Sequence, residues 1–164
     1  MSNLHRIAGQ AVRGAISRGV TVATAESLTA GMVAAMLADT PGASAMLQGG
    51  VVSYQNSVKA EVLGVPPELL DAVGSVDGQV AAAMAEGARR LCRADIGVST
   101  TGVAGPEPHD DKAVGTVFVG VATAGGSASY AYSFEGNRPE IRGQACAAAL
   151  ERLLEVLSSE AQPG

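Results

Sequence analysis

The sequence of 164 residues predicts a single α/β domain, a three-layer α/β/α sandwich with a mixed central sheet. Helix-periodic and strand-like segments alternate over residues 3–101, which is typical of parallel strands joined by helices. Two later strand-like segments are joined by Gly125-Gly126, which indicates an antiparallel hairpin. Apolar residues make up 47% of the chain and aromatic residues only 3%, so the predicted core consists of Ala, Val, Leu and Met.

The elements follow in order from the spacing of apolar residues and from the turn residues that flank them. The first half is expected to hold a helix over 3–18, a strand over 20–25, a helix that ends at 40–42, a strand over 49–54, and short helices beginning at 56 and 66. The second half is expected to hold a helix over 77–93, a strand over 95–101, a loop over 102–113, strands over 114–123 and 127–135, and a helix from 137 to about 159. We expect one domain over 1–164, with an ordered core over about 4–158 and no room for a second domain.

Charge and hydropathy exclude several classes of protein. The net charge is −5 and no basic run is present, which argues against binding to nucleic acid. No apolar run approaches the roughly 20 residues that span a bilayer, and the N-terminus lacks the apolar region of a signal peptide. We therefore expect a cytoplasmic protein with no membrane association. Cys92 and Cys146 fall in helical patterns and are expected to be buried free thiols.

Ser27 occupies the turn between the strand predicted at 20–25 and the helix that follows. Free N–H groups and the helix dipole at such a turn stabilise negative charge. A nucleophilic serine and the oxyanion that it generates both need this setting. The residues leave two interpretations open: Ser27 is a nucleophile, or Ser27 or Thr29 is only the N-cap of the helix.

Lys59 follows the end of the next strand, five residues after Tyr54, and Lys112 is the only other lysine. A lysine in a desolvated pocket has a lowered pKa and can act as a general base, here for Ser27. The alternative is a solvated lysine on a short helix. Neither histidine, His5 or His109, is well placed for a Ser-His-Asp triad.

Small and hydroxylic residues follow the strand predicted at 95–101. Gly102, Ala104 and Gly105 would let a ligand approach the backbone closely, and the Thr101 hydroxyl could bond a substrate. An ordinary Gly/Pro turn is the alternative. The loops after 25, 54 and 101 all follow strands, so we expect them to converge on one edge of the sheet.

Arg138 and Arg142 are four residues apart at the start of the last helix, so they share a face. Two guanidinium groups there suit a phosphate or a carboxylate, whereas the alternative is surface pairing with Glu135, Glu140 or solvent. His109, Asp110 and Asp111 match no metal-binding signature, and we expect no metal.

Together these segments resemble the C-terminal domain of the CinA proteins, a family that includes stand-alone nicotinamide mononucleotide deamidases. The matching blocks keep the order and approximate spacing of that family and lie at 24–31 (TAESLTAG), 49–59 (GGVVSYQNSVK), 101–106 (TGVAGP), 114–117 (VGTV) and 134–138 (FEGNR). The resemblance covers roughly residues 4–158.

The resemblance implies an amidohydrolase that converts nicotinamide mononucleotide to nicotinate mononucleotide and ammonia without a cofactor. It assigns Ser27 as the nucleophile and Lys59 as its base, and it brings Tyr54 and Thr101 into the site. The late arginine of the family corresponds to Arg138 or Arg142, either of which would meet the 5′-phosphate. The nucleotide is the expected partner, and a homodimer is expected at the level of the family.

The chemistry of amide hydrolysis also needs donors for the oxyanion. The N–H groups at Thr29, Ala30 and Gly31 are expected to supply them.

Two departures from the family pattern bear on specificity. Ala30 stands where a glycine is common, and Pro108 stiffens a loop where the family usually has a glycine pair. Two other functions are compatible with these departures: a nucleotide-binding module without catalysis, and a serine–lysine hydrolase of another small amide.

Overall fold

The computed structural model describes residues 2–159, so residue 1 and residues 160–164 of the predicted domain lie outside the described residues. The helices are α1 (Ser2–Arg18), α2 (Met32–Ala38), α3 (Asn56–Glu61), α4 (Pro67–Val73), α5 (Gly78–Leu91) and α6 (Arg138–Ser159), with a 3-10 turn, η1 (Ala43–Ala45). The strands are β1 (Val22–Glu26), β2 (Leu47–Val52), β3 (Ile96–Gly102), β4 (Thr116–Thr123) and β5 (Gly126–Ser133).

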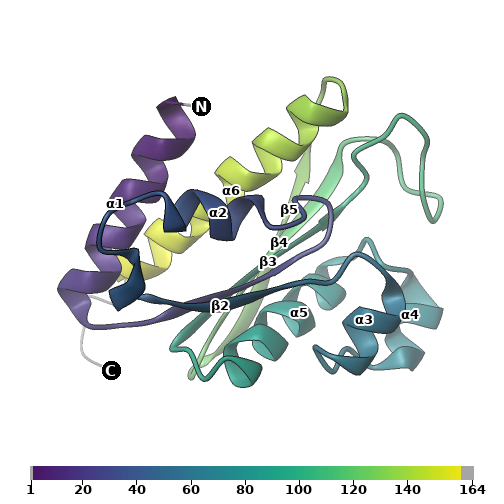
Figure 1. The fold of residues 1–164 in the computed structure, drawn as a ribbon. Helices are drawn as coiled ribbons and strands as arrows, with labels where there is room; N and C mark the ends of the chain where they lie inside the picture. Colours follow the sequence, from purple (N-terminus) through teal and green to yellow (C-terminus); the bar gives the residue numbers. More distant parts are fainter. Residues whose placement is uncertain (1, 160–164) are drawn as a thin grey trace.

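The five described strands form one sheet in the order β2-β1-β3-β4-β5. β1 runs parallel to both β2 and β3, whereas β4 and β5 are antiparallel to their neighbours. Figure 1 shows α1, α2 and α6 on one side of this sheet and α3, α4 and α5 on the other. The predicted three-layer α/β/α sandwich with a mixed sheet is confirmed, and the carboxyl ends of β2, β1 and β3 lie at one edge.

The α5 helix packs unusually close to the sheet because glycines face it. A Cβ atom at Gly97 of β3 or at Gly120 of β4 would overlap the helix carbonyls of Ala85 or Ala81. Small residues at this interface thus allow close packing of helix and sheet in a chain with few aromatic residues.

Several elements differ in their bounds from the sequence prediction, β2 among them. β2 begins at Leu47, two residues before the predicted start, because it pairs from there with Val22 of β1. It ends at Val52, so Ser53 and Tyr54 lie beyond the strand. The 3-10 turn η1 was not predicted, because it contains only small residues with no helical periodicity.

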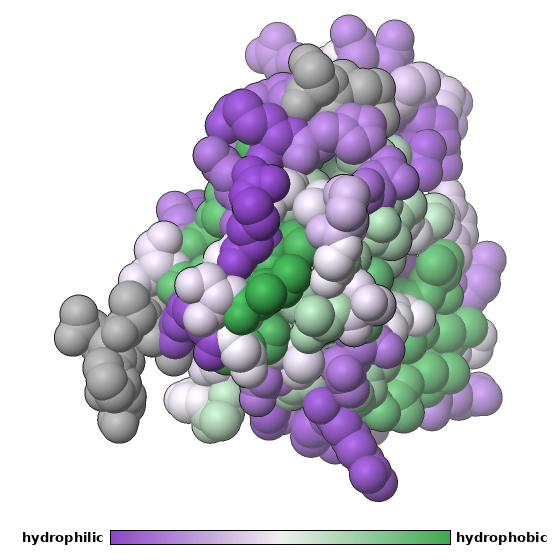
Figure 2. Space-filling model, turned by 60° about the vertical axis from the view of Figure 1, so that its left-hand side comes forward, coloured by the Kyte–Doolittle hydropathy of each residue, from purple (hydrophilic) through white to green (hydrophobic). Residues whose placement is uncertain are grey.

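Figure 2 shows one face of the molecule, on which hydrophilic residues are interrupted by smaller apolar areas. The large hydrophobic side chains that are exposed are Ile16, Val52, Tyr54, Val62 and Leu91. Over residues 2–159, no helix combines the length and the hydropathy that crossing a bilayer requires.

Thr24 of β1 provides a test of the core. Its hydroxyl is buried and has no hydrogen-bond partner among the described residues. We expect Thr24→Val to raise the free energy of unfolding by about 1 kcal/mol, because an unsatisfied hydroxyl is replaced by a methyl group of similar volume. Urea denaturation would measure this change.

Thr21→Val is the matched control for this substitution. The Thr21 hydroxyl donates to Asp95 Oδ2 at 3.2 Å and accepts from the Asp95 N–H at 3.1 Å, so its loss is expected to destabilise the fold. Equal losses of stability in Thr21→Val and Thr24→Val would contradict the account of the Thr24 hydroxyl.

Candidate active site

Ser27 stands on a turn that leaves the end of β1. Its N–H donates to the carbonyl of Thr100 at 3.0 Å, which ties the turn to β3. The turn closes where the N–H of Ala30 donates to the carbonyl of Ser27 at 3.1 Å. α2 begins only after Gly31, which is its N-cap at φ 99°. The alternative that Ser27 or Thr29 caps the helix is therefore wrong.

The buried carboxylate of Glu26 takes the place of that cap. Its Oε1 accepts from the N–H groups of Gly31 at 3.1 Å and Val33 at 2.9 Å, and its Oε2 accepts from the N–H of Ala34 at 2.9 Å. The Thr29 hydroxyl donates to the same carboxylate at 2.6 Å. The first amides of α2 are thus occupied from within the protein.

This arrangement corrects the predicted oxyanion site at Thr29, Ala30 and Gly31. The amide of Ala30 is bonded to the carbonyl of Ser27, and that of Gly31 to Glu26. The Thr29 side chain is buried, and none of the three residues lines the cavity described below. The sequence does not reveal that the residue before the serine folds back over the helix start.

Lys59 of α3 is only 1% exposed, and its amino group points at the serine. Nζ donates to Ser27 Oγ at 3.1 Å, to the carbonyl of Ser53 at 2.8 Å and to the carbonyl of Tyr54 at 3.3 Å. The loops after β1 and β2 therefore meet at this point, as the sequence predicted. The alternative of a solvated surface lysine is wrong.

Burial lowers the pKa of Lys59 from 10.5 to about 8, an effect that the negative charge of Asp110 partly offsets. A neutral amine keeps two N–H bonds and one lone pair. The carbonyls of Ser53 and Tyr54 match the two N–H bonds, which leaves the lone pair for the hydroxyl of Ser27. The site can thus hold Lys59 as a general base.

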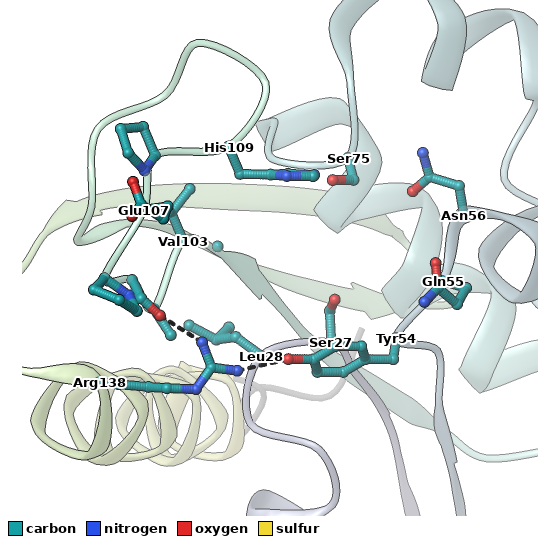
Figure 3. Close-up of a pocket in the computed structure, with 15 residues that line it drawn as sticks. Ser27, Leu28, Tyr54, Gln55, Asn56, Ser75, Val103, Glu107, His109 and Arg138 are labelled. Carbon is teal, nitrogen blue, oxygen red and sulfur yellow. Dashed lines mark hydrogen bonds between the residues drawn. The ribbon is translucent and has the colours of Figure 1, made fainter.

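Tyr54 and Arg138 come together beside the serine (Figure 3). Arg138 Nη2 donates to the Tyr54 hydroxyl at 2.7 Å, and Nη1 donates to the carbonyl of Gly105 at 2.6 Å. These bonds hold the guanidinium group against the loop after β3 and leave its other N–H groups for an anion.

Thr101 does not reach the lysine or the cavity. Its hydroxyl donates to the carbonyl of Ser75 at 2.6 Å, and its side chain is buried. The prediction that the Thr101 hydroxyl bonds a substrate is therefore wrong. Thr101 instead supports Ser75, which lies in the cavity wall and which no sequence signal indicated.

Arg142 lies on the same face of α6 as Arg138, but it has a different role. Its Nε donates to the carbonyl of Leu28 at 2.7 Å, and its Nη2 donates to the carbonyl of Thr29 at 3.2 Å. It does not line the cavity. The prediction that Arg142 binds a phosphate is therefore wrong. The alternative, that it pairs at the surface with Glu135 or Glu140, is wrong as well.

A cavity of about 500 Å³ lies at the carboxyl edge of the sheet. Its lining residues come from five segments of the chain and are Ser27, Leu28, Tyr54, Gln55, Asn56, Ser75, the stretch 102–109, and Arg138. Gly102, Ala104 and Gly105 thus line it as predicted from their small size. Figure 3 shows Arg138 and Tyr54 on one side of Ser27, with Ser75 and His109 on the other.

The loop that carries Pro108 is folded over the rim of this cavity. Asp110 and Asp111 have φ values of 50° and 60° and form the turn between His109 and Lys112. Asp110 Oδ2 accepts from the Ser75 N–H at 3.0 Å and from its hydroxyl at 3.2 Å. This anchor places His109 in the cavity wall, which spacing alone did not indicate.

The side chains that could bind a metal do not cluster among the described residues. No group of three or more His, Cys, Asp or Glu side chains lies close enough together to hold an ion. Cys146 is buried as predicted, and burial raises the pKa of its thiol to about 12. Cys92 is also a free thiol, although it is only partly buried.

Comparisons of the sequence and of the structure with known proteins lead to the same family. A sequence model described as the CinA C-terminal domain matches residues 4–157. A CinA-like protein of Frankia casuarinae is 46% identical over 143 residues, which is 87% of this chain and 33% of that protein. The chain thus spans about a third of the length of the first curated relatives that it matches.

Solved structures show the same fold. A competence/damage-inducible protein from Agrobacterium tumefaciens superimposes with a TM-score of 0.90 at 34% identity, covering 95% of this chain and 96% of that one. A competence damage-inducible protein from Klebsiella pneumoniae gives a TM-score of 0.92 at 31% identity, covering 96% and 98% of the two chains.

Proposed function

The chain belongs to the family of CinA C-terminal domains, and from this premise we propose that it is a serine–lysine amidohydrolase that converts nicotinamide mononucleotide and water to nicotinate mononucleotide and ammonia. The observation that carries the proposal is the hydrogen bond of 3.1 Å between Lys59 Nζ and Ser27 Oγ in a water-poor setting. A buried lysine without a carboxylate partner is costly to keep, and activation of a serine is the use that this geometry supports.

In the first half of the reaction, the neutral amine of Lys59 takes the proton of the Ser27 hydroxyl as Oγ attacks the carboxamide carbon. The carbonyl electrons move to oxygen and give a tetrahedral intermediate. Its collapse breaks the carbon–nitrogen bond, and Lys59 returns the proton to the departing ammonia. An ester between Ser27 and the nicotinoyl group remains.

In the second half, Lys59 takes a proton from water as the water attacks the ester carbon. Collapse of this second intermediate breaks the bond to Oγ and returns the proton to Ser27. The products are nicotinate mononucleotide and the free enzyme, so the overall reaction consumes one water and releases one ammonia.

Arg138 is the proposed partner of the 5′-phosphate, since it lies in the cavity wall with N–H groups to spare. We expect Arg138→Gln to raise KM for nicotinamide mononucleotide by roughly 10- to 100-fold, because a charge-assisted hydrogen bond to an anion contributes about 1.5–3 kcal/mol. Steady-state kinetics would measure this. An unchanged KM would remove Arg138 from the substrate site.

The direct test of the function is release of ammonia from nicotinamide mononucleotide by the wild-type chain, with the acid product identified by mass spectrometry. Free nicotinamide is the matched control, because it keeps the amide but lacks the ribose and the phosphate. Turnover of the nucleotide and not of nicotinamide is the expected result. Binding of the nucleotide without ammonia release would replace the proposal with a binding module.

Glu107 favours a second candidate, hydrolysis of another small amide by the same dyad. Glu107 lines the same cavity as Arg138, and its negatively charged carboxylate would repel a phosphate group. A panel of small amides with and without phosphate would decide between the candidates. Turnover confined to amides without a phosphate group would favour the second one.

A further inference from the structure

A single carboxylate, that of Asp110, fastens the loop over the cavity to the segment that carries Ser75. Its Oδ2 accepts from the N–H of Ser75 at 3.0 Å and from the Ser75 hydroxyl at 3.2 Å. Gly74 makes room for this contact, because a Cβ atom there would lie only 2.8 Å from the same oxygen. Gly74 also has a φ of 81°, which favours glycine. The backbone therefore fixes where this carboxylate lies.

Two further side chains hold the same segment in place. The hydroxyl of Thr101 donates to the carbonyl of Ser75 at 2.6 Å, and Nζ of Lys112 donates to the carbonyl of Val76 at 2.6 Å. Asp110 and Lys112 thus bind neighbouring residues of one segment from two points of one loop. The carboxylate of Asp110 cannot leave the cavity wall without breaking several of these hydrogen bonds.

Asp110 carries its negative charge at neutral pH. The N–H of Ser75 is the main influence that holds the pKa of Asp110 below its ordinary value, although burial acts in the opposite direction. His109, whose Nε2 lies 3.3 Å from Asp110 Oδ2, and Lys112 lower this pKa further. A fixed negative charge is therefore bonded to Ser75, which lies in the wall on one side of Ser27 (Figure 3).

Lys59 is the group that this charge can assist. In the proposed reaction its neutral amine becomes a cation when it takes the proton of Ser27. Its amino group contacts the hydroxyl of Ser27 and two backbone carbonyls, and no carboxylate pairs with it among the described salt bridges. A buried cation without a counter-charge is costly. A substrate that displaces water from the cavity would strengthen the attraction to a carboxylate across the wall.

The other charged groups around Lys59 are engaged elsewhere. The buried carboxylate of Glu26 accepts from amides at the start of α2, and Arg138 is bonded to the loop after β3. The remaining acids of the loop over the cavity are exposed, and they are Glu107 and Asp111. Burial is the larger influence on the pKa of Lys59 and lowers it, whereas the charge of Asp110 raises it.

We propose that Asp110 is a positioning residue of the active site, and that its fixed negative charge stabilises Lys59 in the protonated state that the reaction creates. The inference rests on the proposed hydrolase function and deepens it. As Oγ of the serine bonds to the amide carbon, the proton moves to the lysine and the carbonyl electrons move to the oxygen. Asp110 favours the ammonium group in this step without touching the substrate.

The first experiment observes the lysine directly and needs no substrate. The chain has Lys59 and Lys112 as its only lysines, so lysine labelled with carbon-13 at Cε gives one NMR signal for each. Lys59→Met and Lys112→Met identify the two signals. We expect the Lys59 signal to titrate near pH 8 in the wild type, and about half a pH unit or more lower in Asp110→Asn. Asparagine keeps an oxygen for the Ser75 bonds and tolerates the φ of 50° at this position.

Asp111→Asn is the matched control for this substitution. Asp111 is the next residue, it is exposed, and its φ is 60°, so the change removes one charge from the same turn. It is expected to leave the midpoint of the Lys59 signal unchanged. Equal midpoints in the wild type and in Asp110→Asn would overturn the inference. An equal fall in both variants would also overturn it, because only the net charge would then matter.

The second experiment measures how ammonia release depends on pH. A less basic lysine is neutral at lower pH, but it accepts a proton less readily. Asp110→Asn is therefore expected to lower kcat above about pH 8 by roughly 3- to 10-fold, to lose less at neutral pH, and to move the midpoint of the profile downward. The same loss of kcat at every pH, with an unmoved midpoint, would mean a purely structural role for Asp110 and would overturn the inference.

The NMR titration keeps the inference apart from the proposed function. A wild type that releases no ammonia from nicotinamide mononucleotide would contradict the function, whereas the lysine signals would still report on Asp110. A lower midpoint for Lys59 in Asp110→Asn than in Asp111→Asn would then support the inference by itself. An active deamidase whose Lys59 signal does not respond to Asp110→Asn would overturn the inference alone.

Discussion

Ser27→Ala is expected to lower kcat for ammonia release by about 10⁴-fold or more, the scale of loss when a nucleophilic serine is removed. Alanine keeps the turn but has no atom to form the ester. The cavity, Arg138 and the backbone amides remain, so binding of the nucleotide should persist. Ammonia release would be measured together with nucleotide binding by calorimetry, so that loss of chemistry is separated from loss of the site.

Ser57→Ala is the control for this substitution, because Ser57 is an exposed serine on the neighbouring helix α3. It is expected to retain wild-type kcat. A Ser27→Ala protein that kept most of its activity would show that another group attacks the amide, and the serine–lysine mechanism would have to be abandoned.

Lys59→Met is expected to lower kcat by about 10³-fold, within the range attributed to a general base. Methionine has similar length and no ionisable group, so the pocket stays filled while the proton acceptor is lost. Lys112→Met is the matched control, since Lys112 is the only other lysine and donates to the carbonyl of Val76 outside the cavity. A comparable loss in both variants would point to an effect on folding rather than on the base.

The pKa of Lys59 also predicts how the activity of the wild type depends on pH. A base acts only when it is deprotonated, and the pKa of Lys59 is lowered to about 8. The rate at subsaturating substrate should therefore rise as the pH passes through about 8 and then level off. A rate that is independent of pH between 7 and 9 would mean that a group other than Lys59 takes the proton.

The substitution Lys59→Met should change stability in the opposite sense to activity. Because the folded-state pKa of Lys59 lies below the ordinary value of 10.5, the unfolded chain binds more protons between about pH 8 and 10.5. The burial cost is thus complete below about pH 8 and disappears toward pH 10.5. Lys59→Met removes that cost, so we expect it to be more stable than wild type at neutral pH, and the difference should shrink at alkaline pH.

Most of the fold was predictable because it depends on local patterns. Alternating helices and strands, a glycine-joined hairpin and small apolar residues predicted the mixed sheet and its three layers. The errors lie where pairing between distant segments decides the boundary, as at Leu47, which joins β2 because β1 lies beside it. The helix after Ser27 starts late for a similar reason, since Glu26 caps it from a position that periodicity does not describe.

The sequence by itself determined the family, the fold class and the pairing of Ser27 with Lys59 as candidates, because each depends on residue types in a fixed order. The tertiary structure alone decided how each polar group is used. It shows that Thr101 donates to the carbonyl of Ser75 and that Arg142 donates to a carbonyl of the turn after Ser27. Arg138, by contrast, lines the cavity. Hydrogen bonds and burial are relations between segments far apart in the chain, and a lysine becomes a base only when neighbouring segments exclude water from it.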